Sequence, residues 1–151
     1  MTVFNNSGSR NASCQGISKI SSRLNDQYRV FIVDADYTIA STLATILQQY
    51  GLDARFYTEP REALQASRSE APQFLVAEVM LPQLSGVELA IQILQYSSDC
   101  RVLLVSHSHD AAYILKETAR AEGYDFELLP KPVHPAVLLD MIQNVFEAPA
   151  G

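Results

Sequence analysis

The sequence is poor in the residues that stabilise or mark specialised proteins. Its 151 residues include two cysteines, Cys14 and Cys100, and no tryptophan. Because there is no CxxC pair, neither a disulfide scaffold nor a cysteine zinc site is expected. No apolar run approaches the roughly 20 residues that a membrane-spanning helix needs, and the N-terminus lacks the basic and then apolar pattern of a secretory signal. We therefore predict a cytoplasmic protein without membrane association.

A basic surface is also lacking. The chain has 11 Lys and Arg against 17 Asp and Glu, a formal net charge of −6. Binding to a nucleic acid depends on basic side chains that displace its condensed counterions, so we predict no nucleic-acid partner. The charge is uneven along the chain: residues 1–29 carry a net +3 and the remainder a net −9.

The chain is predicted to hold one domain with short ends. Serine and asparagine dominate the first 25 residues, with six and four copies, and such a composition favours a flexible arm. We predict an N-terminal arm over 1–27, a domain over 28–148 and a tail over 149–151. Within the arm, Ile17, Ile20 and Leu24 have helical spacing and could form a short docked turn.

From Arg29 onward, short apolar runs alternate with amphipathic stretches. Strands are predicted over 29–33, 53–57, 74–77, 102–105 and 126–129. A first helix is predicted with its apolar face starting at Ile39 and its end at Gly51, and a second helix begins at 59–62. Three further helices are predicted over 86–96, 111–121 and 135–146. This alternation is typical of a parallel sheet that is covered by helices on both faces.

Polar side chains follow the apolar runs. Asp34 to Asp36, Glu78, Ser106 and Lys131 stand at the ends of the first, third, fourth and fifth strands. In parallel sheets these carboxyl ends share one edge, where ligands bind. The sequence therefore predicts a site at this edge.

The motifs, in their order, resemble the receiver domain of two-component response regulators over about residues 29–147. The most specific match is the loop Leu81–Gly86, and 30–34, 102–106 and 129–132 match the other motif strands. The resemblance implies a flavodoxin-like (βα)5 doubly wound parallel sheet with strand order 2-1-3-4-5.

The resemblance also implies a chemistry for the strand ends. In the family, two acidic residues after the first strand help to bind Mg²⁺, and an Asp after the third strand accepts a phosphoryl group. A hydroxyl and a lysine, here Ser106 and Lys131, bond the phosphoryl oxygens. An aromatic residue on the fifth strand reports the change.

This chain departs from the family pattern at three positions. Ala35 replaces the second acidic residue, with Asp36 next to it as a candidate to compensate. Glu78 stands at the phosphoacceptor position, and Leu128 replaces the aromatic residue. The extra methylene moves the Glu78 carboxylate outward by about an ångström, which spoils the geometry for transfer but brings its charge towards Lys131 in partial imitation of a phosphate.

We therefore expect a stand-alone, atypical receiver that is not an enzyme and signals through protein contacts. No cofactor is expected; if Mg²⁺ binds weakly, Asp34, Glu78 and Met80 are its candidate ligands. The expected partners are a histidine kinase or a downstream effector. A homodimer is expected through the face formed by the helix 111–121, the strand 126–129 and the helix 135–146. The segment from Ser106 to Lys131 is a few residues longer than usual, with the surplus around 120–125.

A second hypothesis comes from Asp34-Ala35-Asp36-Tyr37-Thr38, which fits the DxDxT motif of haloacid-dehalogenase-like phosphatases. There Asp34 would be the nucleophile and Asp36 the acid and base. However, that family needs an acidic pair after Lys131, and only Asp140 and Glu147 follow, unpaired.

Simpler roles compete with these functions. Asp34 and Asp36 are good helix caps, and Glu78 can pair with Lys131 for stability alone. His107 and His109 lack a third ligand and are interpreted as ordinary loop residues. Lys131-Pro132 is a candidate cis peptide, as in the family.

Overall fold

The computed structural model describes residues 28–147, in which five strands alternate with five helices. The strands are β1 (Arg29–Val33), β2 (Asp53–Tyr57), β3 (Phe74–Glu78), β4 (Arg101–Ser106) and β5 (Glu127–Pro130). The helices are α2 (Tyr37–Gln49), α3 (Pro60–Ser69), α4 (Gly86–Tyr96), α5 (His109–Ala121) and α6 (Pro135–Glu147). The predicted arm over 1–27 and the tail over 149–151 lie outside the described residues.

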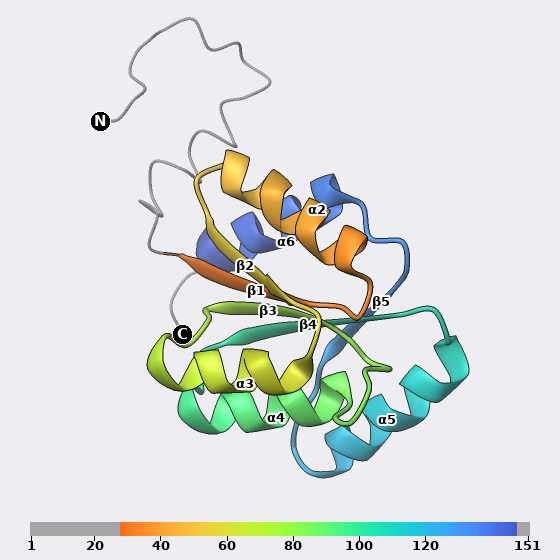
Figure 1. Cartoon of the computed structure of the whole chain (residues 1–151). Helices are drawn as coiled ribbons and strands as arrows, with labels where there is room; N and C mark the ends of the chain where they lie inside the picture. Colours follow the sequence, from red (N-terminus) through yellow and green to blue (C-terminus); the bar gives the residue numbers. More distant parts are fainter. Residues whose placement is uncertain (1–27, 148–151) are drawn as a thin grey trace, which may run out of the picture.

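The strands form one parallel sheet in the order β2-β1-β3-β4-β5, as predicted. Helices α2 and α6 cover one face of the sheet, and α3, α4 and α5 cover the other (Figure 1). Because β1 and β3 are buried on both faces, their side chains alternate between two separate apolar cores: Val30 and Ile32 pack under α2 and α6, and Phe31 and Val33 pack towards α3 and α4.

Several element boundaries differ from the prediction by one or two residues, among them the starts of β5 and α5. The last strand begins at Glu127 instead of Phe126, because the Phe126 ring packs into the second core and stacks on Tyr124. Helix α5 begins at His109 instead of Ala111. The prediction started at the first apolar residue, whereas a helix readily takes polar residues, and a carboxylate such as Asp110, in its first turn.

Local signals explain where the helices that lead away from the site begin. Asp36 caps α2, with its side chain accepting the N–H of Ile39. Ser85 and Glu88 form a reciprocal capping box at the start of α4. A box of this kind satisfies two otherwise unpaired backbone donors, so it fixes the point at which the loop after β3 becomes a helix.

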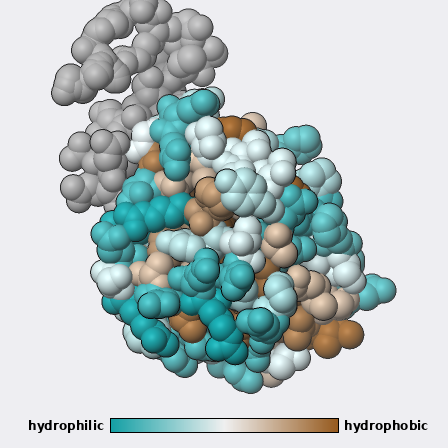
Figure 2. Space-filling model, in the orientation of Figure 1, coloured by the Kyte–Doolittle hydropathy of each residue, from teal (hydrophilic) through white to brown (hydrophobic). Residues whose placement is uncertain are grey.

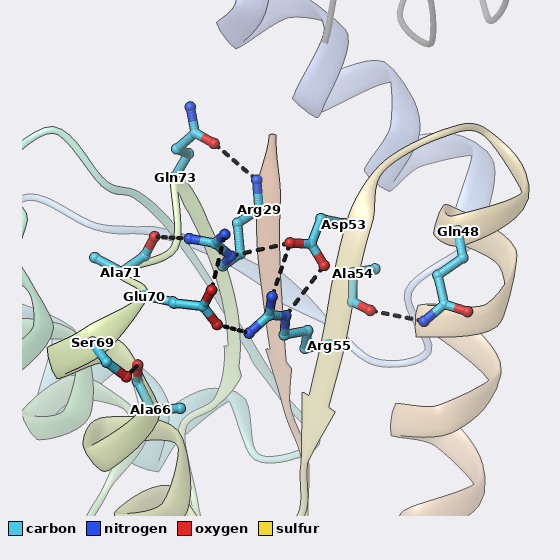
Figure 3. A network of polar contacts seen from close by, with 10 residues as sticks. All are labelled: Arg29, Gln48, Asp53, Ala54, Arg55, Ala66, Ser69, Glu70, Ala71 and Gln73. Carbon is cyan, nitrogen blue, oxygen red and sulfur yellow. Dashed lines mark hydrogen bonds and ion pairs between the residues drawn. The ribbon is translucent and has the colours of Figure 1, made fainter. Parts of the chain in front are cut away.

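A network of charged side chains joins β1, β2 and the end of α3 (Figure 3). Arg29 and Arg55 both bond Asp53, and both reach Glu70 at the end of α3. The Arg29 N–H also donates to Gln73 Oε1. Two cations alternate with two anions, so this network is neutral and holds the outer strand and the helix in place at the edge of the sheet opposite the predicted site.

None of the helices within residues 28–147 has the length and apolar character needed to cross a membrane.

Candidate functional site

The carboxyl edge of the sheet brings together residues that are far apart in the sequence. Glu78 is the last residue of β3 and pairs in register with Val105, while Ser106 ends β4 and pairs with Pro130 of β5. Asp34 directly follows β1 and Lys131 directly follows β5. The strand ends that the sequence singled out therefore do share one edge.

A buried cluster of three charged groups occupies this edge. Lys131 Nζ donates to Asp34 Oδ2 at 2.6 Å and lies 3.6 Å from Glu78 Oε2. The side chains of Lys131 and Asp34 are each 4% exposed and that of Glu78 is 11% exposed. The expected pairing of Glu78 with Lys131 is confirmed, and one ammonium group is shared by two carboxylates.

Sharing one cation leaves an excess of negative charge in the cluster. The pKa of Glu78 is raised above its ordinary value, first by burial and then by the charge of Asp34 and a hydrogen bond with it. Lys131 and His107 pull the same pKa down without reversing the shift. Glu78 therefore holds its proton more readily than an exposed glutamate.

Of the two predicted acidic residues after β1, only Asp34 belongs to the buried cluster. Asp34 Oδ1 accepts the backbone N–H of Asp36 at 2.9 Å, so both of its carboxylate oxygens have a partner. Asp36 is exposed and its side chain caps α2 at 3.2 Å from the Ile39 nitrogen. The expected helix-capping role of Asp36 is confirmed. Because its carboxylate is directed to the helix, Asp36 does not replace the carboxylate that an acidic residue at position 35 would bring to the site.

The loop after β3 holds Glu78 through its backbone. The Gly86 N–H donates to the Val79 carbonyl oxygen at 2.8 Å, and a Cβ atom at position 86 would lie 2.2 Å from the Glu78 carbonyl oxygen. Only glycine fits this approach, so Gly86 positions the end of β3. The Leu81–Gly86 motif pointed to this loop, but the contact with Glu78 was not foreseen.

The remaining predicted residues lie around the cluster. Ser106 is buried, and its hydroxyl bonds the backbone of Ser108, as donor to the carbonyl at 3.1 Å and as acceptor from the N–H at 3.0 Å. Leu128 is half-buried against the core under α4 and α5. Met80 is 52% exposed beside the site. The Lys131-Pro132 peptide bond is cis, as expected.

The donor set at this edge does not fit Mg²⁺. This ion prefers an octahedron of oxygen ligands, whereas Ala35 offers no side-chain oxygen, both oxygens of Asp34 are engaged, and Lys131 Nζ already contacts Asp34 and Glu78. Within residues 28–147, no group of three or more His, Cys, Asp and Glu side chains could hold a metal ion. His107 is exposed in the connection after β4, as expected of a loop residue, whereas His109, also exposed, is the first residue of α5.

The phosphatase hypothesis gains no support from this geometry. Its nucleophile, Asp34, is buried and bonded to Lys131 at 2.6 Å. Its acid and base, Asp36, is committed to capping α2.

Comparison with solved structures supports the receiver fold. The BeF3-activated DrrB receiver domain is 27% identical, with a TM-score of 0.67, and the match covers 80% of this chain and 97% of that one. CheY4 from Vibrio cholerae, a chemotaxis protein, is 24% identical with a TM-score of 0.65, over 78% of this chain and 97% of that one.

Comparison with curated proteins gives relatives that are longer than this chain. The regulatory protein PgtA of Salmonella typhimurium, named for phosphoglycerate transport, is 26% identical over 121 residues, which are 80% of this chain and 28% of PgtA. CreB of Escherichia coli, a transcriptional regulatory protein, is 33% identical over 96 residues, 64% of this chain and 37% of CreB. The chain spans about a quarter to a half of the length of the curated relatives it matches.

The sequence profile of the response regulator receiver domain matches residues 30–143. These residues contain β2 to β5, all of β1 except Arg29, the buried charge cluster and the loop that Gly86 closes. The chain therefore belongs to the response regulator receiver domain family.

Proposed function

We propose that this chain is an atypical receiver, which is not phosphorylated at position 78 in the usual way and signals through protein contacts. The observation that carries the proposal is the buried cluster in which Lys131 bridges Asp34 and Glu78. Receiver domains as a family are signalling modules of two-component systems, so the proposal concerns how this one departs from its family.

Three features argue against phosphoryl transfer to Glu78. Its side chain is longer than that of an aspartate, so an attacking oxygen would be displaced by about an ångström from the position that transfer needs. Its pKa is raised by burial and by Asp34, which reduces the fraction of the nucleophilic carboxylate. The donor set lacks the second acid that would help to hold Mg²⁺, since position 35 is alanine.

The cluster also supports a built-in signalling state. Glu78 places a carboxylate 3.6 Å from Lys131 without any modification. This imitation is partial, because a carboxylate carries one charge and a phosphate about −1.5 to −2 at pH 7. Lys131 lies nearer to Asp34 than to Glu78, and Ser106 bonds Ser108. Because these contacts form without a phosphoryl group, we propose that the sequence alone sets the balance between the inactive and the active arrangement of this receiver.

We propose that partners dock on the face made by α5, β5 and α6. Two large apolar side chains of α5, Tyr113 and Ile114, are 54% and 64% exposed, and Val137 of α6 is 44% exposed. Hydrophobic surface gathers over α5 at the lower right of Figure 2. A histidine kinase, a downstream effector or a second copy of the chain are the proposed partners. A strict monomer at high concentration in light scattering would count against the second copy.

The test compares three proteins incubated with acetyl phosphate and Mg²⁺ and then weighed intact. The wild type is expected to gain no phosphoryl adduct. The double variant Ala35→Asp, Glu78→Asp restores both acidic positions and serves as the matched control, and Glu78→Asp alone separates the loss of the acceptor from the loss of metal binding. A stable adduct on Glu78 of the wild type would overturn the proposal.

A further inference from the structure

A groove of about 480 Å³ lies at the edge of the sheet opposite the charge cluster. It is bounded by the connection 123–127 between α5 and β5, by the start of β4 and by the second half of α6. The sequence placed a few surplus residues around 120–125, and this connection forms one wall of the groove.

The lining of the groove mixes apolar and polar groups, and its rim is charged. Tyr124 and Phe126 stack with ring centroids 5.9 Å apart. Apolar lining residues come from α4, β4, α6 and the connection between α5 and β5: Leu94, Val102, Tyr124, Phe126, Met141 and Val145. The charged lining residues are Arg101, Asp125 and Glu127, a net charge of −1.

The N-terminal segment joins the domain close to this groove. The Arg29 carbonyl accepts the Gln73 N–H, and the Gln73 carbonyl accepts the Arg101 N–H, so β1 and the groove residue Arg101 are two strand spacings apart, or about 10 Å. Cys100 and Arg101 act electrostatically on the Tyr28 phenol. The start of β1 and the end of α6 lie on the same side of the molecule, at the left of Figure 1.

We propose that this groove binds the chain's own N-terminal segment, through Ile17, Ile20 and Leu24. Leu24 precedes Tyr28 by four residues, a reach of about 13 Å in extended form, which is enough to enter the groove. The three apolar residues are spaced by three and four, so they lie on one side of a helical turn. They match the apolar side chains that line the groove better than the serine-rich remainder of the segment does.

Charge and tethering favour this occupant. Residues 1–27 carry Arg10, Lys19 and Arg23 against Asp26, a net +2, which complements the net −1 of the charged lining. Of its two carboxylates, that of Asp125 already lies 3.7 Å from Lys116 Nζ. A covalently linked segment is present at an effective concentration on the order of millimolar, so a contact too weak for a free peptide suffices. The docked segment would cover the amino edge of the sheet and leave the charge cluster and the α5 face open to partners.

Paramagnetic relaxation in the full-length protein tests the proposal. A nitroxide is attached at position 21 in the background Cys14→Ser, Cys100→Ala, Ser21→Cys, and amide signals are compared with those of the reduced label. The expected result is loss of intensity for groove residues 123–127 and 141–145, with signals of Ala35 and Met80 at the opposite edge retained. The matched control carries Ile17→Ser, Ile20→Ser and Leu24→Ser with the same label, and it is expected to recover the groove signals.

Three outcomes would overturn the proposal. The first is retention of the groove signals. The second is equal loss in the control with the three serines, which would mean that proximity to the tether, not docking, causes the effect. The third is loss that appears only when labelled protein is mixed with unlabelled, isotope-enriched protein, which would assign the groove to a second copy. If Cys100→Ala perturbs folding, Cys100→Val serves in its place.

Discussion

Replacing Lys131 with methionine removes the one cation of the buried cluster and keeps most of the side-chain volume. In the wild type, the ammonium lies 2.6 Å from Asp34 Oδ2 and 3.6 Å from Glu78 Oε2. The variant leaves two carboxylates, 4% and 11% exposed, next to each other without a counterion. We expect Lys131→Met to be among the most destabilising single changes at this edge.

The magnitude follows from these distances and from the burial. With an effective dielectric constant of about 20, the two attractions amount to roughly 6 and 5 kcal/mol before the cost of desolvation is subtracted. Breaking a buried pair by removing one partner costs about 3–5 kcal/mol in the free energy of unfolding. The loss relative to the wild type is expected to shrink at acidic pH, because protonation of Glu78, whose pKa is raised, removes one of the two negative charges.

Urea unfolding followed by far-UV circular dichroism measures this loss, since the chain has no tryptophan to report on folding. The double variant Lys131→Met, Glu78→Gln is the matched control and is expected to recover part of the loss, because only Asp34 is then left without its counterion. A loss under about 1 kcal/mol for Lys131→Met, the value of an exposed ion pair, would refute the account of a buried cluster.

Three further variants test separate contacts. The first is Glu78→Gln. Because the pKa of Glu78 is raised, the folded wild type binds this proton more tightly than the unfolded chain does, so the stability of the wild type falls as pH rises from the ordinary pKa of 4.5 through the raised one. Urea unfolding should show the variant becoming more stable relative to the wild type over that pH interval, and a relative gain in stability at acidic pH instead would contradict the assigned shift. Gly86→Ala should lose stability and shift the amide signals of residues 78 and 79, because its Cβ would meet the Glu78 carbonyl oxygen at 2.2 Å; unchanged spectra would show that the loop does not position β3. Asp36→Ala should lose about 0.5–2 kcal/mol through its cap on α2, while Asp36→Asn should retain most of it; equal losses in thermal unfolding would argue for a role of the charge itself.

The fold could be predicted because each of its elements is strongly patterned. The runs 30–33 and 74–77 are continuously apolar, as is typical of strands buried on both faces, and each is followed by a carboxylate, Asp34 or Glu78. Proline at position 60 and the motif ending at Gly86 fixed two helix starts. The strand at 127–130 was misplaced by one residue because Phe126 is apolar in either register, and only packing against Tyr124 decides its place.

The sequence predicted which residues form the site, but not how their side chains are arranged. Strand ends determine which side chains share an edge, so Asp34, Glu78 and Lys131 could be grouped from the sequence. Which carboxylate lies nearer to Lys131, and whether Asp36 is directed to the site or to a helix, depend on side-chain rotamers that a single sequence does not encode. The contact of Gly86 with the Glu78 carbonyl is a tertiary approach of two backbones, and the sequence shows only that a glycine is present.

Intact-mass analysis after incubation with acetyl phosphate and Mg²⁺ shows whether Glu78 accepts a phosphoryl group. We predict an unmodified mass for the wild type under conditions in which a receiver domain with an aspartate at this position gains an adduct. A stable phosphoryl adduct on the wild type, lost in Glu78→Gln, would contradict it.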